Sequence, residues 1–202
     1  MSVTRFSIPL SFESADALVQ GVREGDARAR SAFYDAHAPG VARALSAVLG
    51  PDPELADVLH ETFMHAYDAI DHLRETERVG AWIRQIAVHR ARACIRRRRR
   101  FRLLHVLGLA PEHDVACPRA ASPETREALV ETYRVLGEMS ADLRVPFALR
   151  HIEGLELTEV ASACDTSLAT IKRRLQAAEA RFSALARRSG KLDEWLAEGR
   201  FA

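Results

Sequence analysis

Residues 155–182 read LELTEVASACDTSLATIKRRLQAAEARF, and this stretch decides the fold class. A short helix whose apolar face carries Leu157 and Val160 precedes a polar break at residues 164–166. Ser167 can N-cap a second helix, because its hydroxyl can accept a hydrogen bond from an unpaired backbone N–H in the first turn. Two helices joined by such a tight turn predict a helix-turn-helix.

The second helix of this motif has two chemically different faces. Apolar residues recur at steps of four and three, which makes one stripe along the helix: Ile171, Leu175, Ala178, Phe182 and Leu185. The other side carries Ala169, Lys172, Arg173 and Gln176. A helix that packs one face and offers small, basic and amide side chains on the other is suited to a DNA major groove. An ordinary surface helix with a solvated basic face is the alternative, which the motif alone leaves open.

Charge is distributed unevenly along the chain, although the formal net charge of the 202 residues is only +1. Residues 52–77 contain eight acidic side chains against Arg74 alone. Residues 82–111 contain no acidic side chain and accumulate arginines, five of them in the run Arg96 to Arg100. This asymmetry predicts two different partners, one basic and one anionic.

Helical patterns cover nearly the whole chain, with Gly and Pro mostly between them. The predicted helices span about 14–24, 26–38, 40–49, 52–70, 78–100, 124–138, 141–152, 156–163 and 167–187. Prolines and a glycine interrupt the pattern over 103–123, which reads as a linker. We therefore expect an all-α protein of two small helical domains, 14–102 and 124–187, the second a helix-turn-helix, followed by a tail over 188–202. The apolar residues of 103–109 either extend the preceding helix or dock on a partner.

The acidic segment 52–71 predicts an amphipathic helix. Asp57, Glu61, Met64 and Asp68 follow one another at steps of four, three and four, so they share a face. A row of carboxylates repels itself slightly and gains stability when a basic partner covers it. A solvated acidic face is the alternative interpretation.

The basic segment 78–100 predicts a second amphipathic helix. Its spacing buries Trp82, Ile83, Ile86, Ala87 and Cys94. Its exposed ridge carries Gln85, His89, Arg92 and Arg96. Amide, imidazole and guanidinium groups on one ridge can contact phosphates and unpaired bases, and the arginine run suits a phosphate backbone. A merely solvated basic run is the alternative, but five like charges in an ordered helix favour an anionic partner.

Metal and enzyme interpretations fit the spacing poorly. His60-Glu61 and His65 resemble a zinc-protease motif, but five residues rotate about 140° around a helix, so the two imidazoles do not share one metal. A metal-dependent hydrolase built on the remaining scattered histidines finds no ligand set. Three cysteines lie far apart without a Cys-x-x-Cys pair, which indicates neither a disulfide framework nor a zinc ribbon. No metal and no cofactor are expected.

The sequence shows no pattern that would direct the chain to or across a membrane. The sequence has no apolar run near the length of a membrane span and no signal-peptide pattern. We therefore expect a cytoplasmic, reduced protein that does not insert into a membrane.

The order of these segments resembles that of the extracytoplasmic-function (ECF) sigma factors, the small two-domain initiation subunits of bacterial RNA polymerase. The resemblance covers about residues 14–187. It rests on the acidic helix DVLHETFMHAYDAIDHLR, the following GAWIRQIAVHRARACIRRRRR, the linker, and the helix-turn-helix that ends in ATIKRRLQAAEARFSAL.

The resemblance implies roles for individual residues. Asp57 and Glu61 match positions that bind the clamp helices of the largest polymerase subunit. The loop 71–80, with His72, Leu73 and Arg74, matches the element that captures a flipped base of the minus-ten promoter element, and His89 matches a base-contacting position. Gln85, Arg92 and Arg96 share the ridge of His89 and are assigned to the same DNA. Thr170, Lys172, Arg173 and Gln176 match the readers of the minus-35 element. Core RNA polymerase, promoter DNA and an anti-sigma factor are the implied partners, and no catalysis is expected.

The chain also departs from the family pattern. His60 stands where Gln is usual, and His89 where Asn is frequent. The loop lacks the common aromatic residue, and Ala177 and Glu179 stand at frequent arginine positions. A stand-alone helix-turn-helix regulator that dimerises through its N-terminal helices is the alternative function. The acidic face at Asp57 and Glu61 distinguishes the two, since a sigma factor needs it for polymerase and a repressor does not.

Overall fold

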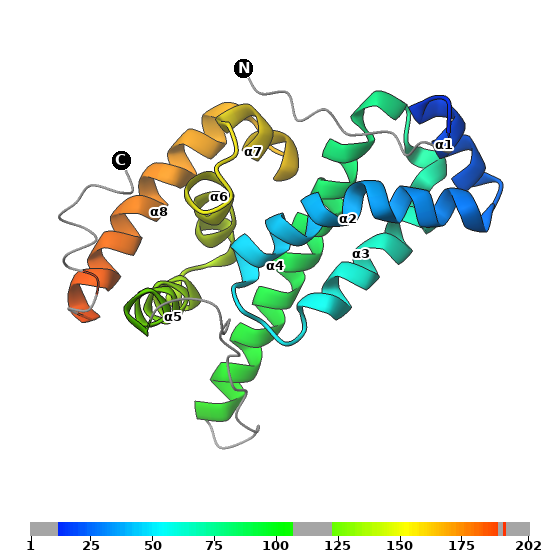
Figure 1. The fold of residues 1–202 in the computed structure, drawn as a ribbon. Helices are drawn as coiled ribbons and strands as arrows, with labels where there is room; N and C mark the ends of the chain where they lie inside the picture. The colour runs from blue at the N-terminus through cyan, green and yellow to red at the C-terminus, as the bar shows by residue number, and fades with distance from the viewer. Residues whose placement is uncertain (1–11, 107–122, 190–191, 193–202) are drawn as a thin grey trace.

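The computed structural model describes residues 12–106, 123–189 and 192, and this part of the chain is built from helices. The N-terminal elements are α1 (Ala15–Arg23), α2 (Ala27–Leu49), α3 (Leu55–Ala69), the short 3₁₀ helices η1 (Ile70–His72) and η2 (Thr76–Arg78), and α4 (Val79–Val106). The C-terminal elements are α5 (Pro123–Glu138), α6 (Ala141–His151), α7 (Leu157–Ala163) and α8 (Leu168–Ser189). The expected all-α fold with a C-terminal helix-turn-helix is confirmed (Figure 1).

The predicted break between two helices at residue 39 is wrong. The sequence suggested two helices, 26–38 and 40–49, but α2 runs without interruption from Ala27 to Leu49 and contains Pro39. Proline lacks an N–H and removes the hydrogen bond to the carbonyl four residues earlier, here that of Asp35. Both residues are exposed, so water can replace the missing donor, while apolar residues on the other side of α2 hold the helix in the core.

The α4 helix reaches further than the predicted end at residue 100. It continues to Val106, so the first four residues of the predicted linker extend the helix. The rest of that segment, 107–122, and most of the tail 188–202 lie outside the described residues.

The N-terminal unit, α1 to α4, packs around a core of aromatic and aliphatic side chains. Ser14 and Asp26 cap α1 and α2 through their side-chain oxygens, which fixes where both helices begin. Phe33 of α2 meets Phe63 of α3 edge to face, with ring centroids 6.2 Å apart. The α4 helix packs along both α2 and α3, and its Ile83 is buried.

The C-terminal unit contains the helix-turn-helix. The α7 helix begins with a capping box in which Glu156 and Glu159 each bind the other's backbone N–H. The turn that follows places Asp165 in the left-handed region, with φ of 50°. The Oγ of Ser167 then accepts a hydrogen bond from the backbone N–H of Thr170 at 3.2 Å, which confirms Ser167 as the cap of α8.

The two units pack against each other. The α6 helix lies on α2 and α4, and α7 lies on α4 (Figure 1). One apolar core cluster includes Val48 and Ala91 of the N-terminal unit together with Leu149 and Val160 of the C-terminal unit. A separate cluster around Phe182 lies within the C-terminal unit.

None of the described helices is long and apolar enough to cross a membrane.

Candidate polymerase and nucleic-acid interfaces

The recognition helix α8 presents the expected polar face. Ile171 and Leu175 are buried, and Lys172, Arg173 and Gln176 on the other side are exposed. Three side chains that can donate to phosphates or base edges therefore project from one face of the second helix of a helix-turn-helix.

Two residues near the start of α8 differ from the sequence-based expectation. Thr170, a predicted DNA contact, is half-buried, and its Oγ1 lies 2.9 Å from the Oγ of Ser167. Its hydroxyl thus supports the helix cap. Leu168, which sequence reasoning missed, is 37% exposed at the first position of α8. Its position at the start of the second helix could have marked it as a candidate DNA contact, because the N-terminal end of a recognition helix contacts base edges.

The acidic face of α3 forms as expected. Asp57, Glu61 and Asp68 are exposed and make no ion pair with any described residue. Met64 lies among them with 47% of its surface exposed. The face therefore offers unpaired carboxylates around an exposed apolar side chain, a combination that favours a basic protein partner.

The carboxylates that precede α3 serve a different purpose. Asp52 and Glu54 form ion pairs with Arg98, and Glu54 also pairs with Arg97 at 2.9 Å. The expectation that the acidic stretch and the arginine run face separate partners is wrong for these four residues. They join the start of α3 to α4, while Arg96, Arg99 and Arg100 are exposed.

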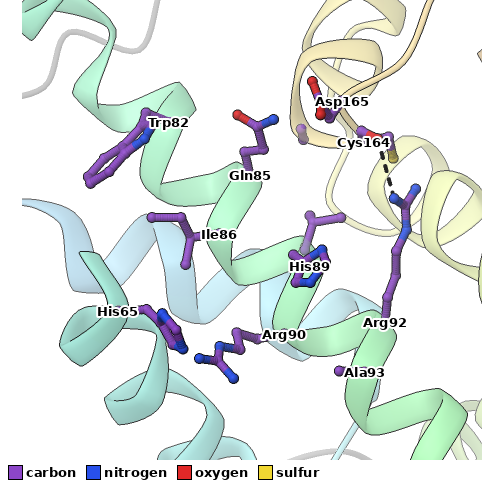
Figure 2. Close-up of a pocket in the computed structure, with 12 residues that line it drawn as sticks. His65, Trp82, Gln85, Ile86, His89, Arg90, Arg92, Ala93, Cys164 and Asp165 are labelled. Carbon is purple, nitrogen blue, oxygen red and sulfur yellow. Dashed lines mark hydrogen bonds between the residues drawn. The ribbon is translucent and has the colours of Figure 1, made fainter. Parts of the chain in front are cut away.

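The ridge on α4 faces the C-terminal unit. A cleft of about 510 Å³ is lined by Gln85, His89 and Arg92 from α4 and by Cys164 and Asp165 from the helix-turn-helix (Figure 2). His89 is exposed, but Gln85 and Arg92 are half-buried. The sequence correctly placed these side chains on one ridge, yet expected that ridge to be open to solvent.

Arg92 is held between the two units. Its Nη1 donates to the carbonyl of Cys164 at 3.3 Å (Figure 2). Its Nε and Nη2 are buried without a hydrogen-bond partner in the described part of the chain. Leaving buried donors unpaired costs free energy, so this guanidinium is poorly satisfied in the observed arrangement.

The loop between α3 and α4 exposes fewer of its predicted DNA-contacting residues than expected. His72 and Arg74 are exposed, but Leu73 is buried with 5% of its surface exposed. Arg23 donates to the carbonyl of Leu73 at 2.7 Å, which fixes the loop to α1. The Leu73 side chain belongs to the core, so its assignment as a base contact does not fit this conformation.

The cleft also contains an aromatic side chain that the sequence pattern did not assign to it. Trp82 was predicted as a core residue, but it is half-buried and lines the cleft with His89. In Figure 2 it extends on the side of α4 away from Arg92. An indole next to amide and imidazole groups can stack on an unpaired base, a capacity that the aromatic-free loop lacks.

Metal and thiol chemistry find no support in the described residues. No group of three or more His, Cys, Asp or Glu side chains there lies close enough to hold a metal ion. Cys94 and Cys164 are free and buried, and Cys117 lies outside the described residues. Burial, helped by the neighbouring Glu54, raises the pKa of Cys94 to about 11, and burial also raises the pKa of Cys164. Both thiols therefore stay protonated at neutral pH.

Comparison with known proteins identifies the family. Residues 33–101 match the model of sigma-70 region 2, and residues 123–182 match that of sigma-70 region 4. A probable RNA polymerase sigma-C factor of Mycobacterium bovis is 30% identical over 163 residues, which cover 81% of this chain and 86% of that protein. The chain belongs to the sigma-70 family. The ECF RNA polymerase sigma-E factor of Escherichia coli K12 is 26% identical over 174 residues, which cover 78% of this sigma factor and 86% of that one.

This sigma factor is of the ECF type and directs RNA polymerase to initiate transcription at specific promoters. The region 2 match argues against a stand-alone helix-turn-helix regulator, because it makes the N-terminal helices, from Phe33 onward, part of a sigma factor.

Two solved structures share the fold of this sigma factor. The sigma factor RpoE of Bartonella quintana, in complex with the anti-sigma factor NepR, aligns with a TM-score of 0.57 at 20% identity and covers 78% of this chain and 96% of its own. CnrH, in complex with the cytosolic domain of CnrY, aligns with a TM-score of 0.57 at 22% identity and covers 85% of this chain and 97% of its own.

Proposed function

We propose that three surfaces divide the work of this sigma factor. The acidic face of α3 binds core polymerase, the ridge of α4 binds the unpaired minus-ten strand, and the exposed face of α8 reads the minus-35 element. The separation of unpaired carboxylates on α3 from unpaired cations on α8 supports this division, because each surface attracts a partner of opposite charge.

On α3, Asp57 and Glu61 meet basic side chains of the polymerase clamp. Both are exposed on one face, and Met64 adds an apolar contact between them and Asp68. Opposite charges across an interface accelerate association and fix its register, whereas like charges cost several kcal/mol. The contact therefore sets how the sigma factor docks on polymerase.

On α4, His89 and Gln85 contact a base that has left the duplex, and Trp82 stacks on it. A base hides its Watson–Crick edge inside a duplex, so these groups can act only after the strands separate. Arg92, Arg96 and the exposed Arg99 and Arg100 bind the phosphate backbone without regard to sequence.

On α8, Arg173 and Gln176 read base edges in the major groove. A guanidinium binds guanine O6 and N7, and an amide binds adenine N6 and N7, both in pairs. Leu168 offers an apolar contact to a thymine methyl group, and Lys172 binds phosphate as a point charge.

The protein acts by binding alone, without catalysis of its own, and it acts in the cytoplasm, where polymerase and chromosomal DNA lie. We also infer an inhibitory protein partner. Both fold relatives described above are complexes, one of them with a named anti-sigma factor.

Reconstituted transcription tests the assignment of the α4 ridge. The purified chain and core polymerase are given a library of random promoter sequences, and transcripts are sequenced to find the promoters used. On such a promoter, His89→Ala and Trp82→Ala should reduce permanganate reactivity of unpaired thymines, while Arg181→Ala, an exposed change on α8, should not. A pre-melted promoter should restore the part of the loss that comes from strand separation. Wild-type melting in both variants would show that opening starts elsewhere.

A further inference from the structure

The loop between α3 and α4 is tied to α1 by two side-chain hydrogen bonds. The loop spans 70–78, and α1 lies beside both of its short helices, η1 and η2 (Figure 1). Nη2 of Arg23, at the end of α1, donates to the carbonyl of Leu73 at 2.7 Å. The hydroxyl of Thr76 donates to Oδ1 of Asp16, in the first turn of α1. We call Asp16 and Arg23 the α1 support.

The α1 helix is itself fixed to the core. Leu18, Val19 and Val22 are buried in the apolar cluster of the N-terminal unit. A Cβ at Gly21 would lie 2.7 Å from the Cβ of Ala29 on α2, so the two helices are in close contact at this point. A loop that is tied to α1 is therefore tied to the core.

The two hydrogen bonds lie on either side of Arg74. Leu73, directly before it, also has a buried side chain, and Thr76 follows two residues later. Arg74 is exposed and makes no ion pair with any described residue, whereas Arg78 pairs with Glu75 at 2.9 Å. The support thus fixes the main chain around a guanidinium that is exposed to solvent.

Arg23 also moderates the charge of the loop. Its Nε lies 3.9 Å from Oδ1 of Asp71, whose side chain is 80% exposed. An unpartnered carboxylate at this position would repel a nucleic-acid strand, and the neighbouring guanidinium offsets part of that repulsion.

The loop leads directly into the α4 ridge. It ends at Arg78 and α4 begins at Val79, so Trp82 and Gln85 lie in the first two turns after the loop. Val79 is buried, which anchors the junction. Ordering a loop only when its ligand binds costs conformational entropy, and fixing the loop beforehand avoids that cost. A loop fixed by α1 can therefore bind a strand on the ridge without being ordered first.

We propose that the α1 support is a positioning element for the minus-ten strand: Asp16 and Arg23 hold the loop so that Arg74 contacts the unpaired strand beside the ridge. The support acts through the loop and needs no contact with DNA. The proposal rests on the proposed binding of the unpaired minus-ten strand to this unit.

Paired variants in the full chain test the proposal. Thr76→Val removes the hydroxyl and keeps a side chain of similar shape, whereas Thr76→Ser keeps the hydroxyl. Arg23→Ala removes the guanidinium, whereas Arg23→Lys keeps a cationic donor. Gln20→Ala is the control on the same helix, because the Gln20 amide donates to Glu24 within α1, at 2.8 Å, and does not hold the loop.

Two measurements separate positioning from a general effect on the fold. Hydrogen–deuterium exchange of the amides of 71–78 reports the order of the loop in the absence of DNA. Each variant is then bound to core polymerase and titrated with a single-stranded minus-ten oligonucleotide, taken from a promoter selected in the random library, and with the same oligonucleotide changed at one base. Loss of folded protein lowers both apparent affinities equally and leaves their ratio, the base discrimination, unchanged.

Thr76→Val and Arg23→Ala should both accelerate exchange in the loop and reduce the base discrimination. Each should weaken binding of the preferred oligonucleotide by between about two- and tenfold, as expected for the loss of one hydrogen bond. Thr76→Ser, Arg23→Lys and Gln20→Ala should stay close to wild type. If Arg23→Ala fails to fold by circular dichroism, the two Thr76 variants decide alone.

Unchanged exchange in Thr76→Val and Arg23→Ala would overturn the proposal. Faster exchange with wild-type affinity and discrimination would overturn it as well, and so would equal losses in Thr76→Ser and Thr76→Val. His89→Ala and Trp82→Ala in the same titration test the ridge separately. Losses in the ridge variants alone would refute the α1 support, whereas losses in the support variants alone would refute base contact by the ridge and leave the support standing.

Discussion

Arg98, near the middle of the arginine run on α4, is bound to Asp52 in the turn before α3. Its Nη2 lies 2.6 Å from Oδ1 of Asp52 and 2.6 Å from Oε2 of Glu54. The Asp52 side chain is only 5% exposed. Because its guanidinium satisfies a buried carboxylate, Arg98 contributes to the stability of the fold, even if the exposed arginines beside it bind DNA.

Arg98→Ala should therefore act on stability, and Arg99→Ala on DNA binding. The first change leaves the Asp52 carboxylate buried without its partner and should lower the free energy of unfolding by about 2 kcal/mol. Arg99 is exposed, so its removal should leave stability unchanged within about 0.5 kcal/mol. Urea denaturation measures both values.

The effect of Arg99→Ala on DNA binding is measured from the salt dependence of the affinity. If Arg99 binds a phosphate, Arg99→Ala should reduce the slope of log affinity against log salt concentration by about 1. An Arg98→Ala protein as stable as the wild type would show that the ion pair contributes nothing to the fold.

Local patterns gave most of the helices, because periodicity and caps act within a few residues. Ser167 was identified as a cap from its position alone, and the stripe with Ile171 and Leu175 is buried as expected. The break at Pro39 was wrong because packing along a 23-residue helix outweighs one missing hydrogen bond.

Contacts between distant segments could not be read in the same way. Periodicity placed Gln85, His89 and Arg92 on one ridge, but only the tertiary arrangement shows that the helix-turn-helix covers part of it. The same holds for Leu73, whose side chain joins the core through a loop with no periodic pattern. The sequence pattern does not distinguish Arg144 from other helical arginines. Only the structure shows its hydrogen bond to Leu49 at the end of α2, 95 residues away.

Reversing the charge of the acidic face should abolish most polymerase binding. Asp57→Lys with Glu61→Lys places two cations where the proposed partner is basic, and like charges at an interface cost several kcal/mol. The helical content should stay the same, since both residues are exposed and make no described ion pair. Surface plasmon resonance with core polymerase measures the loss.

A matched double reversal controls for net charge. Glu13→Lys with Glu24→Lys makes the same change at exposed positions around α1 and should retain nearly wild-type affinity. Equal losses in the two double variants would indicate that general charge, and not the α3 face, governs docking.

Single alanine changes on α8 should separate base reading from phosphate binding. Arg173→Ala and Gln176→Ala should each relax the preference for particular minus-35 bases, at a cost of about 1–3 kcal/mol for the preferred base. Lys172→Ala should weaken binding evenly across sequences. Selection from the promoter library gives the base preferences of each variant. Arg187→Ala, exposed in the last turn of α8, is the control, and base preferences identical to wild type in all four variants would contradict base reading by α8.

Acid should destabilise the fold through His37. This side chain is 3% exposed in the core beside Phe33, with ring centroids 4.7 Å apart, and burial lowers its pKa from 6.5 to about 4. The folded protein therefore holds a neutral imidazole at pH values where the unfolded chain already binds a proton. Stability rises with pH wherever the unfolded state binds more protons, so the contribution of His37 is present above pH 6.5 and is lost as the pH falls toward 4.

The size of this effect follows from the two pKa values. Between pH 7 and pH 5 the titration of His37 should lower the free energy of unfolding by about 2 kcal/mol. His37→Leu removes the titrating group and keeps an apolar side chain of similar size, so its stability should change less over the same interval. Urea denaturation of both proteins at the two pH values measures the difference, in which all other titrating groups cancel. Parallel losses of stability in the two proteins would mean that His37 remains neutral in the unfolded chain or accepts its proton without unfolding, and the acid sensitivity would then belong to other groups.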